Sequence, residues 1–132
     1  MICELADNQN ERSGLTVSAQ RLVETGFGDH PLWRGFLAES DDGAAGYATY
    51  TEDFHIWSGA PRIMLDDIYV RPECRSHGLG EALMRCVFER AEEKGAFVNW
   101  TVQTDNRRAI EFYKRLGAQY RVIGKCGWCP GG

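Results

Sequence analysis

A chain of 132 residues, 43% of them hydrophobic and 26% charged, suits one globular domain with a single core, so one domain is predicted over residues 1–132. The formal net charge of −4 argues against nucleic acid as a partner, because phosphate binding needs a basic surface. No apolar run reaches the roughly 18 residues of a membrane span, and no signal-peptide pattern opens the chain, so a cytoplasmic location is expected.

The predicted elements begin with two helical pieces in residues 1–25, which are separated near residues 13–14. A serine or threonine is expected to cap the second piece. Two strands, at residues 33–39 and 45–51, follow and form a hairpin through the turn at residues 41–43.

A third strand is predicted at residues 61–70, and it contains two adjacent carboxylates, Asp66 and Asp67. Successive side chains of a strand point to opposite faces, so Asp67 is expected to share its face with Leu65 and Tyr69 while Asp66 faces the other way. Each face then carries one carboxylate, unless a bulge re-aims its neighbour.

A helix is predicted from Gly78 to about Gly95, where a glycine stop follows the last apolar residue of the helical pattern. Residues 97–102 are predicted as a strand, residues 106–116 as a second helix and residues 120–123 as a candidate last strand. This order predicts an α/β fold with a mixed central sheet, in which an antiparallel hairpin precedes a parallel portion flanked by helices.

A short basic loop leads from the third strand into the first of these helices, whose first turn contains Gly78 and Gly80. Free amide groups at a helix N-terminus attract anions, and glycine lets a pyrophosphate approach the backbone without a Cβ in the way. Anion binding is therefore expected here, although G-x-G alone is equally typical of a tight turn. The G-x-G-x-x-G and Walker patterns of nucleotide sites are both absent.

Two motifs resemble the GNAT superfamily of acyl-CoA-dependent N-acetyltransferases. Residues 75–80, Arg-Ser-His-Gly-Leu-Gly, match that family's R/Q-x-x-G-x-G/A pyrophosphate loop, and residues 105–118 resemble its N-x-x-A-x-x-F/L-Y-x-x-x-G-F/A segment. Residues 26–31, 65–70 and 112–115 also resemble the diamine, polyamine and thialysine acetyltransferase branch. The resemblance implies a GNAT-like fold and an enzyme that transfers acetyl from acetyl-CoA, as co-substrate, to a primary amine of a small cationic molecule.

The resemblance also implies which residues bind the coenzyme. Backbone groups of Ile68, Tyr69 and Val70 would pair with its pantetheine arm as an added strand. The pyrophosphate would lie against the loop and the helix start, which supply Arg75, Ser76, His77, Gly78, Leu79, Gly80 and Glu81. The second helix would present Asn106, Ala109 and Tyr113 to the thioester.

Tyr113 is predicted to be the general acid. It follows Asn106 by two helical turns, so both residues lie on one face of the helix. A phenol with a pKa of about 10 can protonate a departing thiolate whose thiol pKa is roughly 8.5. The alternative is an ordinary core tyrosine.

The resemblance implies that Asp66 and Asp67 take part in binding or deprotonating the amine, and Asp67 is predicted to be the catalytic residue of the two. A lysine-like ammonium with a pKa of about 10.4 must lose a proton before it attacks, and a carboxylate can hold the cation and take that proton. The alternative for either residue is a hydrogen-bonded carboxylate near a sheet bulge. Asn99 and Trp100 are further substrate candidates, since they lie where the branch lines its substrate channel, but Trp100 is equally a candidate core residue.

The chain departs from the family in two places. It starts at about the middle of the family's first helix, so the first strand is expected to be missing and residues 33–39 to form an open sheet edge. A homodimer is expected to help cover this edge. Residues 8–9, Asn-Gln, stand where polyamine-specific members carry an acidic residue, so strict polyamine specificity is not expected.

Two other functions stay open at this point, because the motifs identify the coenzyme and not the acceptor. One is an acetyltransferase of a protein amine or an aminoglycoside, and the other is a non-enzymatic acyl-CoA binding module. The five cysteines fit reduced thiols. Cys126 and Cys129 are not expected to be redox-active, because no helix follows them, and a lone pair does not complete a zinc site, so no metal is predicted.

Overall fold

The computed structural model describes residues 1–2, 4–5 and 16–131. The chain forms two compact units, a sheet unit, Met1–Trp100, and a helix unit, Thr101–Gly132. Cys3, the predicted break near residues 13–14 and the Asn-Gln pair at residues 8–9 lie outside the described residues.

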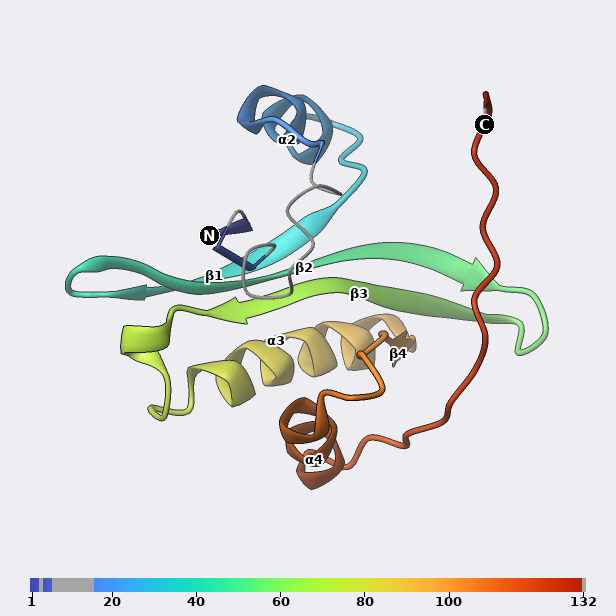
Figure 1. Cartoon of the computed structure of the whole chain (residues 1–132). Coiled ribbons are helices and arrows are strands. Elements are labelled where there is room, and N and C mark those ends of the chain that lie inside the picture. Colours follow the sequence, from blue (N-terminus) through green and yellow to red (C-terminus); the bar gives the residue numbers. More distant parts are fainter. Residues whose placement is uncertain (3, 6–15, 132) are drawn as a thin grey trace. The chain divides into compact units, whose positions relative to one another are not determined.

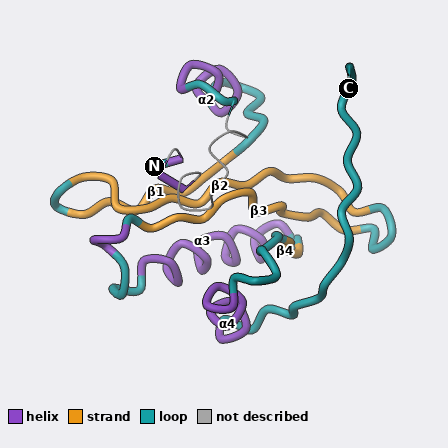
Figure 2. The backbone as a smooth tube through the Cα atoms, in the orientation of Figure 1, coloured by secondary structure: helices purple, strands orange, loops and turns teal. Residues whose placement is uncertain are grey.

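The sheet unit is built on four strands in the order β1-β2-β3-β4. These strands are β1 (Arg34–Ser40), β2 (Gly43–His55), β3 (Ala60–Val70) and β4 (Phe97–Asn99) (Figure 1). The first three pair antiparallel and β4 pairs parallel with β3. Figure 2 shows these strands as the orange segments of the backbone. The predicted α/β fold with a mixed sheet is confirmed.

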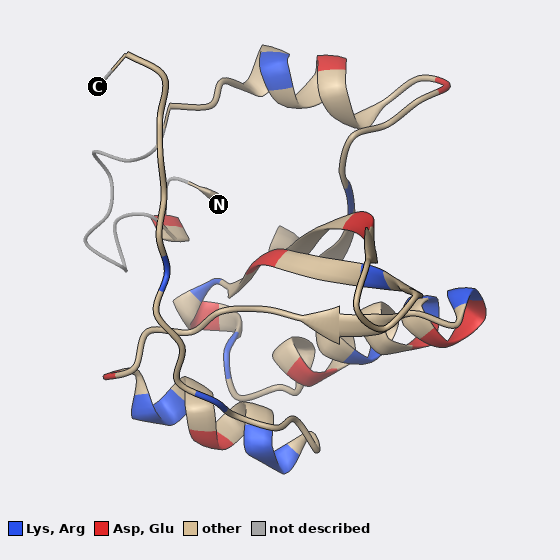
Figure 3. Ribbon diagram, turned by 90° about the vertical axis from the view of Figure 1, so that its right-hand side faces the viewer, with Lys and Arg blue, Asp and Glu red and all other residues tan. Residues whose placement is uncertain are grey.

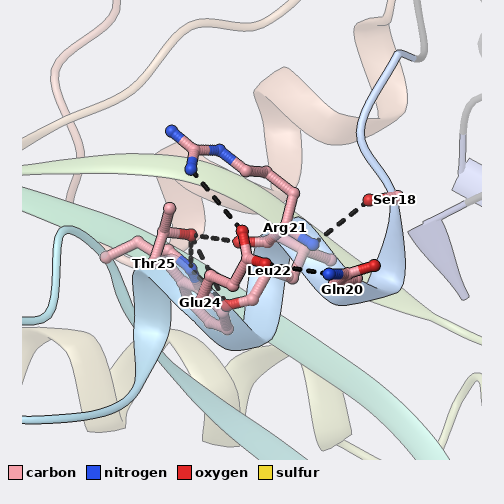
Figure 4. Close-up of polar contacts among 7 residues, drawn as sticks. Ser18, Gln20, Arg21, Leu22, Glu24 and Thr25 are labelled. Atoms are coloured by element: carbon pink, nitrogen blue, oxygen red, sulfur yellow. Dashed lines mark hydrogen bonds and ion pairs between the residues drawn. The ribbon is translucent and has the colours of Figure 1, made fainter.

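Helix α2, Ala19–Gly26, precedes the sheet and confirms the predicted cap. The Ser18 hydroxyl accepts a hydrogen bond from the Arg21 amide at 3.1 Å, which satisfies one of the amides left open at a helix start. Along the helix, the Gln20 side chain donates to Glu24 at 3.0 Å (Figure 4). The indole of Trp33, just before β1, donates to the Leu22 carbonyl at 3.2 Å and so ties the helix to the strand.

A bulge in β3 makes the predicted face of Leu65 wrong. Thr49 of β2 pairs with Asp67 and the next residue, Tyr50, pairs with Leu65, so Asp66 is an extra residue without a cross-strand partner. Thr49 and Tyr50 point to opposite faces because they are adjacent in a regular strand. Leu65 and Asp67 therefore lie on opposite faces of the sheet.

Helix α3, Leu79–Lys94, covers one face of this sheet (Figure 1). Its ends agree with the prediction, since Gly78 and Gly95 flank it in left-handed conformations. Apolar residues of the helix and of the strands fill the space between them: Tyr50, Ile63, Leu65, Leu83, Met84, Val87 and Ala91 are all buried. The opposite face carries a second cluster of Leu5, Tyr47 and Tyr69.

Glu52 connects three elements of the sheet unit. Its carboxylate lies 3.6 Å from Arg34 of β1 and 3.7 Å from Arg90 of α3, and it also pairs with Lys94 of α3. One carboxylate thus holds the edge strand and the end of the helix together.

Two strand predictions near the C-terminus differ from the structure. The strand expected at residues 97–102 ends at Asn99, and the candidate strand at residues 120–123 is wrong, because those residues have no regular hydrogen bonding. A strand needs a neighbour to pair with. The described part of the helix unit contains no strand.

We expect Met84→Ala to lower the free energy of unfolding by about 2 to 5 kcal/mol, because it removes a fully buried side chain between α3 and the sheet and leaves a cavity. Urea unfolding followed by circular dichroism measures the change. Arg85→Ala is the matched control, since Arg85 is exposed and forms an i,i+4 pair with Glu81, so its effect should stay within about 0.5 kcal/mol. Equal effects of the two substitutions would contradict this packing.

Candidate active site

The loop between β3 and α3 runs through a short 3₁₀ turn, Pro72–Cys74, and side chains of the loop contact its own backbone carbonyls. Arg75 Nε donates to the Val70 carbonyl at 2.9 Å, and a ring nitrogen of His77 lies 2.8 Å from the Arg75 carbonyl oxygen. Ser76 has a φ of 68°, which makes it the one non-glycine residue with positive φ in the described part of the chain. Strained backbone of this kind is typical of ligand-binding loops.

Helix α3 starts at this loop without a side-chain cap. Gly78 occupies the N-cap position with φ 77°, and no side chain accepts a hydrogen bond there. A Cβ built on Gly78 would meet no atom within 4 Å, so the space beside it is open. The first-turn amides, which include those of Leu79, Gly80 and Glu81, therefore present the positive end of the helix to an anion.

The edge of β3 that leads into this loop is not covered by β4. The pairs between the two strands are Arg62 with Phe97, Ile63 with Val98 and Met64 with Asn99. Beyond Met64 the described chain places no strand on this side of β3. The backbone of residues 65–70, which includes Ile68, Tyr69 and Val70, is thus an open edge to which an extended ligand can add.

The two carboxylates lie at the start of this open edge. Burial raises the pKa of Asp67, while a hydrogen bond from the Thr49 side chain opposes that rise. The pKa of Asp66 is raised by loss of hydration and further by the charge of Asp67. Paired acids with raised pKa values are suited to hold a cation and accept its proton.

Asn99 and Trp100 follow on the neighbouring strand. Asn99 pairs with Met64, two residues before Asp66, and its side chain is exposed. The ring of Trp100 packs against Phe88 of α3 with centroids 6.3 Å apart, which favours the core alternative for this residue. Asn99 is thus the better placed of the two to meet a substrate.

The helix unit contains α4, Arg107–Arg115, as predicted. The Asn106 side chain caps this helix by accepting a hydrogen bond from the Ala109 amide at 3.2 Å. Tyr113 lies two turns later, and burial raises the pKa of its phenol. That Asn106, Ala109 and Tyr113 meet the same substrate as Asp66 and Asp67 stays a prediction.

Helix α4 is strongly basic. It holds four basic residues, Arg107, Arg108, Lys114 and Arg115, and a single acidic one, Glu111 (Figure 3). Lys114 lies 5.8 Å from the ring centroid of Tyr120 in a cation–π contact. The helix unit thus adds positive charge beside the predicted acid Tyr113.

Sequence reasoning missed Thr49, which nothing in the sequence marks. Its contact with Asp67 follows from the strand register across the bulge, a non-local property.

A separate groove of about 390 Å³ lies between β1, β2 and α3 and is lined in part by Phe36, Tyr50 and Arg90. It shares no residue with the predicted site.

The described residues include no group of three or more His, Cys, Asp or Glu side chains placed to hold a metal. Nor does any helix in that part of the chain have the length and apolar character needed to cross a membrane.

Comparison with known proteins gives a family and relatives. The model of the Acetyltransferase (GNAT) family matches residues 2–118. Thialysine N-epsilon-acetyltransferase of Bos taurus is 35% identical over 133 residues, which cover 90% of this chain and 75% of that protein. The protein of the same name from Sus scrofa is 33% identical over 133 residues, with 90% and 75% covered.

A solved aminoglycoside acetyltransferase from an uncultured soil metagenomic sample, in complex with trehalose, superimposes with a TM-score of 0.78. The match covers 96% of this chain and 84% of that chain at 18% identity, and it shows the fold alone.

We expect Asp66→Asn to raise the free energy of unfolding at pH 7 by about 0.5 kcal/mol, a value kept small because water screens this exposed group. The pKa of Asp66 is higher in the folded chain than in the unfolded one, so its ionised form is penalised on folding. The gain should shrink as the pH falls towards the ordinary Asp pKa of about 3.9. Thermal melts across this pH range measure it.

Asp53→Asn is the matched control with the opposite sign. Hydrogen bonds from Arg62 hold the pKa of Asp53 below its usual value, so this substitution should destabilise the fold at pH 7. A gain in stability for both variants, or for neither, would contradict the assignment.

Proposed function

Because the chain belongs to the acetyltransferase (GNAT) family and is thus an acetyl-transferring enzyme, we propose that it transfers acetyl from acetyl-CoA to a primary amine of a small cationic substrate. A diamine, a polyamine or a lysine analogue is the substrate class. The observation that carries this proposal is the pair of carboxylates at the β3 bulge, which lies at the start of an open strand edge that leads to an uncapped helix start. The thialysine acetyltransferases of cow and pig support the same substrate class.

The sheet unit offers the coenzyme two kinds of contact. Ile68, Tyr69 and Val70 offer an open backbone edge to the pantetheine amides. At the end of this edge, Arg75 and Ser76 lead into an uncapped helix start that offers amides and positive dipole to the pyrophosphate. His77, Gly78, Leu79, Gly80 and Glu81 complete this cradle.

In the proposed reaction the carboxylates bind the ammonium form of the substrate. Asp67 takes a proton from the nitrogen, and the neutral amine then forms a bond to the thioester carbonyl carbon. Tyr113 gives its proton to the sulfur as the carbon–sulfur bond breaks, so that a thiol leaves, and the second proton of the acylated nitrogen then returns to the Tyr113 phenolate to give the neutral amide. Burial raises the pKa of Tyr113 and thereby keeps its phenol protonated until that step. Asp66 and Asn99 orient the amine.

We also infer that the chain forms a homodimer, while the cytoplasmic location stays an expectation. Within the described residues β1 has a strand neighbour only on its β2 side. An uncovered edge of this kind favours pairing with another chain. The exposed apolar side chain of Leu37 on β1 makes solvent exposure of this edge less favourable.

Release of a free thiol from acetyl-CoA, measured with diamines, polyamines, lysine analogues, aminoglycosides and basic peptides, tests the reaction. We expect turnover on small amines, and a loss of about a hundredfold in kcat for Tyr113→Phe, because the variant has no proton to give. Tyr120→Phe is the control, since Tyr120 lies in the same unit and is partly exposed. If acetyl-CoA binds but no amine reacts, the chain is a binding module instead.

Sedimentation velocity tests the dimer. We expect a single species of twice the 14.9 kDa chain mass, which Leu37→Glu converts to a monomer, because a buried unpaired charge opposes association. Glu39→Lys, also on β1 but already charged, should leave the dimer intact. A monomer for the parent chain at all concentrations contradicts the proposal.

A further inference from the structure

Thr49 lies next to a catalytic candidate, Asp67, across two neighbouring strands. It lies directly opposite Asp67 in the β2–β3 pairing, which places its hydroxyl within reach of the Asp67 carboxylate, and this hydroxyl opposes the rise in the pKa of Asp67 that burial causes. Residues paired in this way share a face of the sheet. Asp66, the extra residue of the bulge, has no such partner.

The bulge makes this contact selective. The register shifts between Thr49 and Tyr50, so Thr49 is the last residue of β2 paired before the extra residue of β3. A bulge increases local twist and weakens the ladder that would otherwise fix its side chains. Threonine is branched at Cβ and has few χ1 rotamers, so the position of its hydroxyl is well defined at this point.

We propose that Thr49 is a positioning residue for the Asp67 carboxylate, which it holds in one orientation towards the amine, and that it thereby sets the acid limit of the reaction. This inference rests on the proposed function. Thr49 touches neither substrate nor coenzyme in this role, and it acts only through Asp67. The contact also makes the two neighbouring carboxylates unlike, because only one of them receives the hydrogen bond.

The direction of the effect follows from the hydrogen bond. Burial raises the pKa of Asp67, and the Thr49 hydroxyl lowers it by stabilising the ionised form. Removing the hydroxyl leaves burial unopposed and raises the pKa. Since Asp67 must be ionised to hold a cation and accept a proton, the reaction then needs a higher pH.

The charged groups near the face of the sheet that carries Asp67 include Arg75, whose guanidinium lies 5.6 Å from the ring centroid of Tyr69. Tyr47 and Tyr69 lie along the same face on β2 and β3, and Glu4 from the N-terminal segment bonds to Tyr69. Asp66 adjoins Asp67 on the strand. Burial and the Thr49 hydrogen bond are the causes that act on the pKa of Asp67, so a change at Thr49 should not be masked by these neighbours.

The test compares Thr49→Val, Thr49→Ser and Thr51→Val with the parent. Valine keeps the shape of threonine without the hydroxyl, serine keeps the hydroxyl, and Thr51 lies on the same face of β2 but pairs with Met64. We expect the acid limb of kcat/KM in Thr49→Val to move up by about half to one pH unit, as the loss of one hydrogen bond implies. Activity falls about threefold to tenfold below the limb and little above it.

Thr49→Ser should restore the parental profile, and Thr51→Val should not change it. Titration of the Asp67 carboxyl carbon by NMR gives a readout that needs no turnover, and its midpoint should rise by the same amount in Thr49→Val only. An unchanged midpoint in a folded Thr49→Val protein overturns the inference. A shifted midpoint in a parent protein that acetylates no amine keeps the contact and overturns the proposed function instead.

Discussion

The extra residue at Asp66 is the constraint on which the sheet unit depends. In a regular strand, Ile63, Leu65, Asp67 and Tyr69 would share one face, and helix α3 would then meet a carboxylate where it needs an apolar side chain. Burying that carboxylate without a partner costs several kcal/mol. The bulge resolves this conflict, because Leu65 stays in the core with α3 while Asp67 points to the other face.

The same bulge accounts for the open edge of β3. Pairing with β4 ends at Met64, two residues before Asp66. A bulged strand bends and twists more strongly, so a straight neighbour cannot follow it. The edge beyond is therefore available to a ligand up to the loop at Arg75. After this loop the uncapped start of α3 offers its free amides to the ligand. One inserted residue thus gives both the carboxylates and the coenzyme edge their positions.

The parts of this arrangement that the sequence predicted depend on residues close together in the chain. Gly78 and Gly95 mark both ends of α3, and Asn106 marks the start of α4, because caps and left-handed glycines depend on a few neighbouring residues. The bulge, the early end of β4 and the role of Thr49 depend on which strand lies alongside. Residues 120–123 have strand-like composition, but composition does not supply the partner that a strand requires.

Two adjacent carboxylates would compete for one role if they were alike. An ammonium that binds between them stabilises the ionised form of both and so weakens both as bases. The Thr49 hydroxyl removes this symmetry, since it acts on Asp67 alone and leaves Asp66 with the additional repulsion. In the proposed reaction Asp67 therefore stays ionised to lower pH and is ready to accept the proton, while Asp66 interacts with the remaining positive charge of the substrate. Their difference arises from the neighbouring strand and not from the carboxylates themselves.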